Sequence, residues 1–255
     1  MKFRTAVLFL LICSFAYAQS TKTPQEILKE AVAKAKKSEE IADRVGFYQD
    51  VITRELNDDG KVTDQETRTF RTIWIEDTPY PELMLVDGKQ PNDKQKNEEA
   101  KRRKKFTESL HDNKKDEDEA QGSFSWEELS QKYKFTLLPS EAEAFYVMSF
   151  APLSDDLQER NRVERVINHL RGKIWLDENY NLLKAEAELT EPVKYGYGIL
   201  GKIDELMLNY AQQKYEDLFV PISFHVKFKA RILVKGQQKE IDSKFYDMFP
   251  RTKHP

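Results

Sequence analysis

One stretch of the chain, residues 222–234, alternates between apolar and polar side chains with almost no interruption. Because side chains of a β-strand point to opposite faces with a period of two, this pattern predicts one long strand with one face buried and the other in water. Leu233 alone breaks the alternation. The apolar positions are Ile222, Phe224, Val226, Phe228, Ala230, Ile232 and Val234, and the polar positions include His225, Lys227, Lys229 and Arg231.

The first part of the chain predicts a helix followed by a meander of strands. Thr23, Pro24 and Glu26 supply an N-cap, a proline at the first helical position and a capping-box glutamate. Apolar residues then recur at helical spacing, so we expect an amphipathic helix over residues 23–43. Residues rich in β-branched and aromatic side chains follow, and they predict antiparallel strands at 45–56, 62–75 and 82–86.

Strand patterns also dominate the second half of the chain. Residues 203–215 fit both a helix and a strand, and we interpret them as a strand. Residues 218–221 are interpreted as a turn into the long alternating strand. Strands at these spacings favour antiparallel pairing throughout. The remaining elements expected are strands at 133–138, 144–150, 172–176, 182–189 and 240–248 and a helix at 162–170.

The composition changes abruptly to Lys, Glu, Asp and Arg between residues 92 and 120, where Phe106 and Leu110 are the only large apolar residues. This insertion predicts a solvated helix at 93–110 followed by a disordered acidic tail. The alternative is a docking arm for an acidic surface such as anionic lipid headgroups. A short helix around Trp126 is expected to return the chain to the sheet.

The first residues predict export. A short basic region is followed by an apolar core at residues 6–16 and by the small-x-small sequence Ala16-Tyr17-Ala18. We therefore expect a signal peptide at residues 1–18, cleavage between Ala18 and Gln19, and a periplasmic or otherwise exported protein with no integral membrane span. Cys13 is the only cysteine, so the mature chain would form no disulfide or thiolate metal site. The net charge of −3 argues against nucleic acid as a partner.

Two short motifs resemble ligand-binding loops, but their surroundings point elsewhere. Residues 55–66 align with a calcium-loop pattern, yet their flanks have strand composition, and the Asn-Asp-Asp-Gly sequence at 57–60 favours a hairpin turn. Residues 196–201 read Gly-x-Gly-x-x-Gly, but an exported protein has little access to dinucleotides. We interpret these glycines as a turn or bulge. No cofactor is expected.

Residues suited to catalysis or metal binding are sparse. The four histidines show no pair at metal-ligand spacing, and no serine lies in a Gly-x-Ser-x-Gly sequence. Carboxylates are too numerous for any pair to stand out, so a glycosidase-type arrangement stays open but unsupported. We expect no enzyme activity, no catalytic residue and no metal site. The histidines are His111, His169, His225 and His254.

Several short motifs resemble the periplasmic lipoprotein-carrier superfamily and its outer-membrane lipoprotein-sorting relatives. Residues 170–177, Leu-Arg-Gly-Lys-Ile-Trp-Leu-Asp, continue into Leu-Leu-Lys-Ala-Glu-Ala at 182–187 and resemble a hairpin of those proteins. Residues 218–221 resemble the hydrophobic-proline entry to a later strand. Further motifs at 86–89, 189–193 and 245–247 resemble uncharacterised exported bacterial proteins that we associate with the same superfamily.

The resemblance implies a mainly β (α+β) fold, in which a strongly curved antiparallel half-barrel sheet has helices covering its concave face. Residues 19–255 would then form a single domain with the charged insertion at 92–120. The lid candidates are the helix at 23–43 and the segment around Trp126, with Phe106 and Leu110 in addition. A cavity between lid and sheet would be apolar. The candidate lining residues are Phe224, Val226, Phe228, Leu206, Leu208 and Met148.

Two functions follow as alternatives. The first is an exported cell-envelope protein that binds a lipid, an acyl chain or a lipoprotein-like apolar ligand in this cavity. The second is a non-catalytic interaction or scaffold protein of the cell envelope, which would use the basic strand face or the arm at 92–120 to bind another envelope protein. If the apolar residues instead pack as a closed core, the cavity does not exist.

Overall fold

The computed structural model describes residues 22–42, 44–111, 131–141, 144–154, 157, 159, 162–195, 201–232 and 235–251. The expected signal peptide, the acidic tail, the Trp126 segment, most of the Gly-x-Gly-x-x-Gly sequence, Leu233, Val234 and His254 lie outside these residues.

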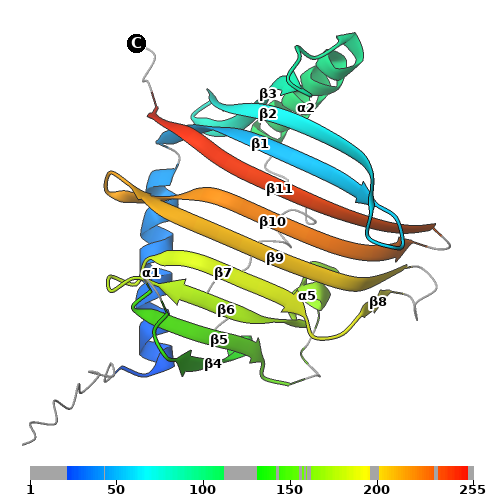
Figure 1. Cartoon of the computed structure of the whole chain (residues 1–255). Coiled ribbons are helices and arrows are strands. Elements are labelled where there is room, and N and C mark those ends of the chain that lie inside the picture. Colours follow the sequence, from blue (N-terminus) through cyan, green and yellow to red (C-terminus); the bar gives the residue numbers. More distant parts are fainter. Residues whose placement is uncertain are drawn as a thin grey trace, which may run out of the picture.

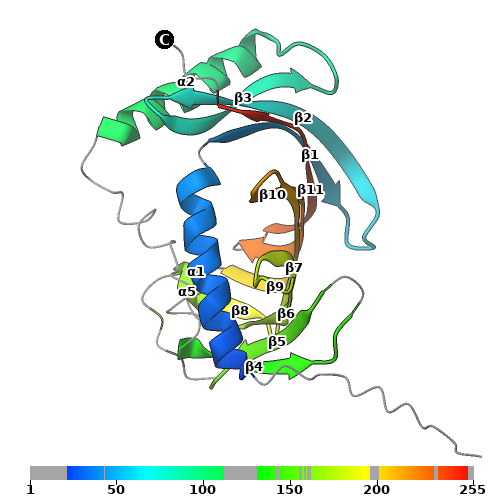
Figure 2. The ribbon, with the colours of Figure 1, turned by 90° about the vertical axis from the view of Figure 1, so that its left-hand side faces the viewer.

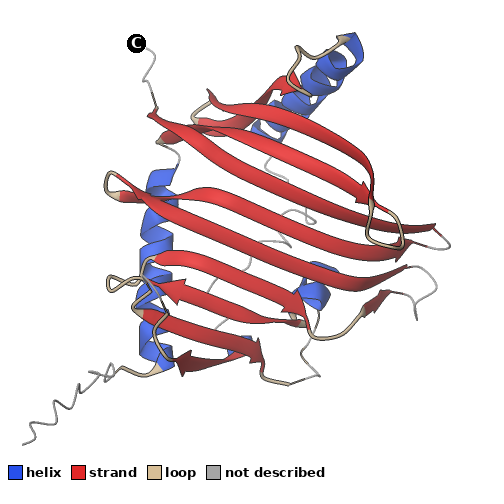
Figure 3. Ribbon diagram, viewed as in Figure 1, coloured by secondary structure: helices blue, strands red, loops and turns tan. Residues whose placement is uncertain are grey.

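The strands of the described chain form one large antiparallel sheet (Figures 1 and 3). Its order is β3-β2-β1-β11-β10-β9-β7-β6-β5-β4, and β8 adds to β9. The sheet is not closed, because β3 and β4 stand at opposite edges. This confirms the predicted class, mainly β with antiparallel pairing. The strands are β1 (Val45–Leu56), β2 (Val62–Ile75), β3 (Thr78–Val86), β4 (Tyr133–Leu138), β5 (Tyr146–Pro152), β6 (Leu170–Leu176), β7 (Leu182–Leu189), β8 (Val193–Tyr195), β9 (Gly201–Tyr215), β10 (Leu218–Ile232) and β11 (Lys235–Pro250).

The described helices are α1 (Pro24–Ala42), α2 (Asp93–His111) and α5 (Arg162–Ile167). The capping box predicted for α1 is present: the Thr23 backbone N–H donates to Glu26 Oε2 at 2.7 Å, and the Glu26 N–H donates to Thr23 Oγ1 at 3.3 Å. α1 lies along one face of the sheet (Figure 2), and its residues Ile27, Leu28 and Val32 belong to the apolar core cluster there. The core cluster at this contact consists of Ile27, Leu28, Val32, Tyr133, Phe135, Tyr146, Met148, Ile174 and Leu176.

Pairing between the first and the last strand holds the two parts of the sheet together. β1 pairs with β11 over nearly its whole length, from Val45 opposite Pro250 to Leu56 opposite Gln238. The meander β1 to β3 therefore extends the sheet on one side of β11, and the rest of the chain builds it on the other. Strands that are far apart in sequence thus become neighbours in the middle of the sheet.

The prediction of a turn at residues 218–221 is wrong. The turn lies at Glu216 and Asp217, where Glu216 adopts a φ of 54°, and β10 has already begun at Leu218. Pro221 is tolerated inside the strand because the pairing with β9 shifts register between Pro221 and Ser223. The ambiguous residues 203–215 do form a strand, β9, as predicted. The helix expected at 162–170 ends earlier, and Leu170 already belongs to β6.

The prediction that β10 has one buried and one wet face also needs correction. Phe224, Val226 and Phe228 are only partly buried, and so are His225 and Lys227 on the other face. On the polar face, long side chains of β11 lie directly opposite: Asp242 faces His225 and Glu240 faces Lys227. The polar side chains shield each other from water, so the polar face is not fully exposed. The apolar face is not fully buried either.

Gly172 of β6 is a position where the sheet requires glycine. A Cβ atom there would lie 1.9 Å from the Glu186 carbonyl oxygen and 2.7 Å from the Phe150 ring. Phe150 is the cross-strand partner of Gly172, and its ring occupies the space that a side chain would need. A backbone oxygen cannot give way without disturbing the pairing of β6 with β7.

We predict that Gly172→Ala destabilises the fold by about 1–3 kcal/mol, because the added methyl group overlaps the β7 backbone and the Phe150 ring. Urea unfolding followed by circular dichroism measures the change. Gly236→Ala is the matched control, since nothing lies within 4 Å of its Cβ position, and it should change stability by less than about 0.5 kcal/mol. Equal effects of the two substitutions would contradict the steric argument.

Candidate functional site

A hollow of about 330 Å³ lies between α1 and the sheet. The helix contributes small side chains here, Ala31 and Ala35, together with Leu28. A larger residue at either alanine position would fill the space, so the hollow depends on these small residues. The sheet side is formed by Ile174, Leu176, Leu182, Tyr210, Phe219 and Pro221.

A second hollow of about 260 Å³ adjoins the first, and Ile174 and Tyr210 line both. All of its lining residues are apolar or aromatic except Glu186, which stands between Ala185 and Ala187 on β7 and whose carboxylate forms an ion pair with Lys184 at 2.5 Å on the other face of the strand. Inward-facing positions of six neighbouring strands, β4, β5, β6, β7, β9 and β10, meet at this hollow, and Ile167 of α5 contributes from the helical side. The other lining residues are Tyr133, Phe135, Phe150, Leu170, Ala185, Ala187, Leu208 and Phe224.

Tyr210 stands at the boundary between the two hollows. Its hydroxyl accepts a hydrogen bond from the Gln212 side-chain amide at 2.6 Å, and its ring makes an edge contact with Phe224 at a centroid distance of 6.4 Å. Burial raises the pKa of Tyr210 above its usual value. The hydroxyl is therefore neutral at physiological pH, and the boundary carries no charge.

Two of the six sequence-predicted lining residues, Phe224 and Leu208, line the second hollow. Met148 is fully buried in the core cluster under α1 and lines neither hollow. The other three lie farther along the same face, where Phe228 pairs with Leu206 and Val226 pairs with Leu208. Alternation placed all six on apolar faces, but it could not show how far along each strand the space opens.

Sequence reasoning missed most of the lining residues, above all Tyr210, Ile174 and the alanines. Tyr210 and Phe224 are direct cross-strand partners, and Ile174 lies opposite Ala185. The signal that could have found them is this register across β6, β7, β9 and β10. It depends on long-range pairing, which one sequence does not reveal.

The start of α1 is fixed to the hairpin between β6 and β7. Lys22 Nζ donates a hydrogen bond of 2.5 Å to the Tyr180 hydroxyl and lies 4.5 Å from the centre of that ring. Tyr180 also stacks on Tyr146 at a centroid distance of 5.3 Å. The hydrogen bond from Lys22, helped by a second one from Tyr146, lowers the pKa of Tyr180. These contacts hold the N-terminal end of α1 in place.

The charged helix α2 packs at the β3 edge of the sheet and not over the hollows. Phe106 contacts Tyr80 at a centroid distance of 5.0 Å, Glu99 accepts a hydrogen bond of 2.8 Å from the Tyr80 hydroxyl, and Arg102 stacks over Tyr80 and Phe70. Burial, followed by the bond to Glu99, raises the pKa of Tyr80 to about 12. The helix predicted at 93–110 is present, and one side of it is docked.

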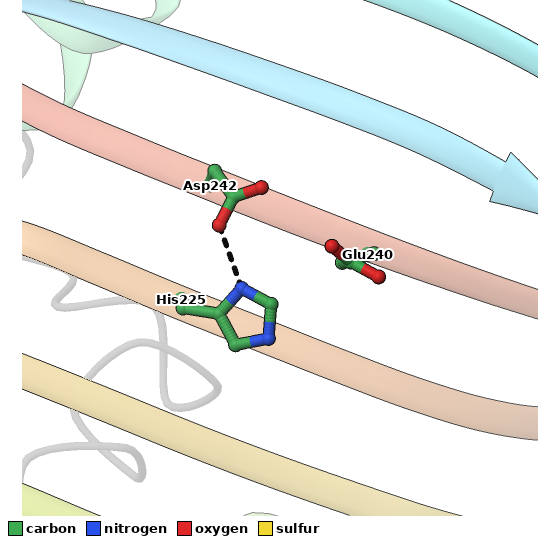
Figure 4. Close-up of side chains that lie close together, drawn as sticks. All are labelled: His225, Glu240 and Asp242. Carbon is green, nitrogen blue, oxygen red and sulfur yellow. Dashed lines mark hydrogen bonds and ion pairs between the residues drawn. The ribbon is translucent and has the colours of Figure 1, made fainter. Parts of the chain in front are cut away.

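The outer face carries a second group of functional side chains, His225, Glu240 and Asp242 (Figure 4). Their ligand-type atoms lie within 4.8 Å of one another, and His225 Nδ1 donates to Asp242 at 2.7 Å. Arg54 already binds both carboxylates, with Glu240 at 3.2 Å. Its guanidinium offsets part of their negative charge, and Lys227 lies opposite Glu240 in the strand pairing. Acidic side chains of β11 therefore stand beside the basic side chains of β10, and this face of the sheet carries both signs of charge.

Three histidines of the described chain face a carboxylate, and none of these pairs lies in a buried cleft. The carboxylate side chain is 37% exposed for Asp242 beside His225, 64% for Glu191, 3.4 Å from His169, and 48% for Glu76, 2.9 Å from His111. Water screens such pairs, and none has the desolvated setting in which acid–base catalysis is tuned.

No family model matches the chain, and no curated protein matches it. Among solved structures, a DUF1329 family protein from Desulfovibrio piger ATCC 29098 is 11% identical, with a TM-score of 0.32 and coverage of 92% of this chain and 96% of that one. The Pseudomonas aeruginosa MucA/MucB complex is 10% identical, with a TM-score of 0.25 and coverage of 90% and 99%. MucB in complex with MucA(peri) is 10% identical, with a TM-score of 0.22 and coverage of 91% of this chain and 100% of that one. Likenesses this weak carry no argument about function.

Within the described residues, no helix combines the length and the apolar character needed to cross a membrane.

We predict that Asp242→Asn destabilises the protein at pH 7 by up to about 1 kcal/mol, a small effect because the pair is partly exposed. Partial burial raises the pKa of Asp242, but hydrogen bonds from His225 and Arg54 outweigh it, so the net shift is downward. A depressed carboxyl pKa contributes stability above the unfolded-state pKa and loses it as the pH falls through the folded-state value.

The difference in the free energy of unfolding between wild type and Asp242→Asn, measured by urea unfolding, should therefore persist at pH 5 and shrink towards pH 3. Asp64→Asn, which changes an exposed carboxyl group of β2, serves as the control and should show little difference at any pH. A difference for Asp242→Asn that stays constant from pH 7 to pH 3 would contradict the assignment.

Proposed function

We propose that this chain is an exported, non-catalytic binding protein for an apolar ligand such as a lipid or an acyl chain. The observation that carries the proposal is the pair of adjoining apolar hollows beneath α1 and α5. The predicted signal peptide supports an exported location, and the resemblance to lipoprotein carriers supports the class of ligand.

The contrast with the surrounding core makes these hollows notable. Ile27, Met148 and Val147 are completely buried, and Leu176 is 1% exposed. Protein interiors are normally packed to the density of organic crystals, and empty apolar space forfeits contacts that neighbouring atoms would otherwise make. A hollow of about 330 Å³ also reaches the size range of small-molecule sites. An apolar ligand would restore the missing contacts.

In this proposal α1 is the cover of a curved half-barrel. The N-terminal half of the helix is fastened to the sheet by Ile27, Leu28 and Val32, and Lys22 adds its contact with Tyr180. The following turns, from Ala31 to Ser38, lie over the first hollow. A ligand would therefore enter past the C-terminal half of α1, because the described side chains there, from Ala33 to Ser38, are not part of the core cluster.

We expect protein purified from its native periplasm to carry bound lipid in native mass spectrometry and to bind a fluorescent fatty acid saturably with one site. Ala35→Trp fills the first hollow and should weaken this binding at least about tenfold, since burial of several methylenes is lost. Fluorescence titration measures the affinity.

Ala33→Trp makes the same substitution at an exposed position of α1 and is the matched control. It should bind like wild type, and circular dichroism should show that both variants fold. The proposal is wrong if wild type shows neither copurified lipid nor saturable uptake, or if Ala35→Trp and Ala33→Trp bind equally.

A further inference from the structure

The two hollows differ in polarity: the first has more polar lining residues than the second. The first hollow has four polar side chains among its lining residues, Lys34, Ser38, Asn181 and Gln212. The second has a single charged residue, Glu186, which is already paired with Lys184. A ligand that fits both hollows would therefore be polar at one end and apolar at the other.

Lys34 is the only charged residue that lines the first hollow. Its side chain is exposed, and it forms no ion pair with any other residue in the described parts of the chain. No carboxylate lines this hollow to balance the ammonium. An anionic group at the rim would supply the missing partner, whereas a cationic group would be repelled.

The neutral polar residues sharpen this preference. The Gln212 amide donates to the Tyr210 hydroxyl at 2.6 Å, and the Asn181 amide donates to Asp177 at 2.8 Å. Each amide therefore uses one of its two N–H donors within the protein, and neither amide carries a charge. The Lys34 ammonium is the charged donor at this hollow, and the Ser38 hydroxyl lies one turn away on α1.

The path from the rim into the second hollow passes Ile174 and Tyr210, which line both spaces. In the second hollow, of about 260 Å³, the apolar chain of a ligand would contact Phe224, Leu208 and Ala187. The two hollows thus share part of their walls, and Lys34 is the one cation that lines the first of them.

We propose that the ligand is a single-chain amphiphile with one anionic head group, carboxylate or phosphate, that pairs with Lys34 while its chain runs past Tyr210 into the second hollow. This inference rests on the proposed function, because it names the ligand class of the same hollows.

Head-group selection is tested by competition against a bound fluorescent fatty acid. The competitors are palmitate, hexadecyl phosphate, hexadecanol and hexadecyltrimethylammonium, each below its micelle-forming concentration. Wild type should prefer both anions over hexadecanol by about three- to tenfold, as expected for one partly exposed charge pair, and should bind the cation most weakly. The preference should decrease between 0.01 and 0.5 M salt because of screening. The ratio of the two anions distinguishes carboxylate from phosphate.

Lys34→Gln should abolish the preference for anions while leaving the affinity for hexadecanol unchanged. Lys37→Gln is the matched control, because it removes the same charge from an exposed position of α1 that does not line the hollow. This variant should keep the preference of wild type. An unchanged preference in Lys34→Gln, or an equal loss in both variants, overturns the head-group assignment.

The chain assignment is tested with Ala187→Phe, which fills the second hollow. Palmitate should lose affinity in this variant, by about fourfold for each methylene that is excluded, whereas decanoate should lose much less. Ala151→Phe, at an exposed position of β5, is the control for the substitution. Equal losses for the long and the short chain overturn the chain assignment.

The outcomes separate this inference from the proposed function. If all four head groups bind wild type equally and Ala35→Trp still prevents binding, the apolar site stands and the anionic head group is wrong. If no competitor displaces the probe, and no probe binds saturably, the proposed function fails and this inference fails with it.

Discussion

The packing of α1 against β4, β5 and β6 is the contact on which the candidate site depends. A sheet of this size needs an apolar cover on at least one face, and the described helices are few. Ile27, Leu28 and Val32 provide that cover near the start of α1, where the core is dense. Further along the same helix, alanines replace the larger residues and the contact opens into the first hollow. The first turns of α1 therefore pack tightly against the sheet, and its later turns leave space above the sheet.

The pairing of β1 with β11 decides which side chains share a face with the hollows. It places the meander β1 to β3 and helix α2 beyond β11, on the side away from the strands that line the hollows. It also brings Arg54 of β1 beside Glu240 and Asp242, so basic and acidic side chains of the outer face lie next to one another. Because of this pairing, the basic side chains of β10 do not form a separate basic surface. The other face of β10 points towards the hollows, where Phe224 lines the second.

Local patterns predicted much of the fold, because local chemistry determines it. The bounds of β1, β2, β4 and β7 follow from alternation and from turn residues, and the Asn57–Gly60 hairpin forms where its sequence indicates, with Gly60 at a φ of 76°. The turn before β10 was misplaced because Pro221 stands inside a strand at a register shift. The candidate site was predicted only in part: alternation marks Leu208, Tyr210 and Phe224 alike as inward-facing, and long-range register decides which inward positions line the hollows.

Small residues explain why a hollow cannot be recognised directly from the sequence pattern. Alternation marks a position as inward-facing whether it carries leucine or alanine, but only the size of the side chain decides whether the space is filled. Ala185 and Ala187 lie on inward positions of β7, and Gly172 faces Ala187 across the pairing with β6. The Phe150 ring fills the space over Gly172 and at the same time lines the second hollow. The absence of a side chain at Gly172 of β6 therefore gives the Phe150 ring of β5 its position. That ring in turn forms part of the wall of the second hollow.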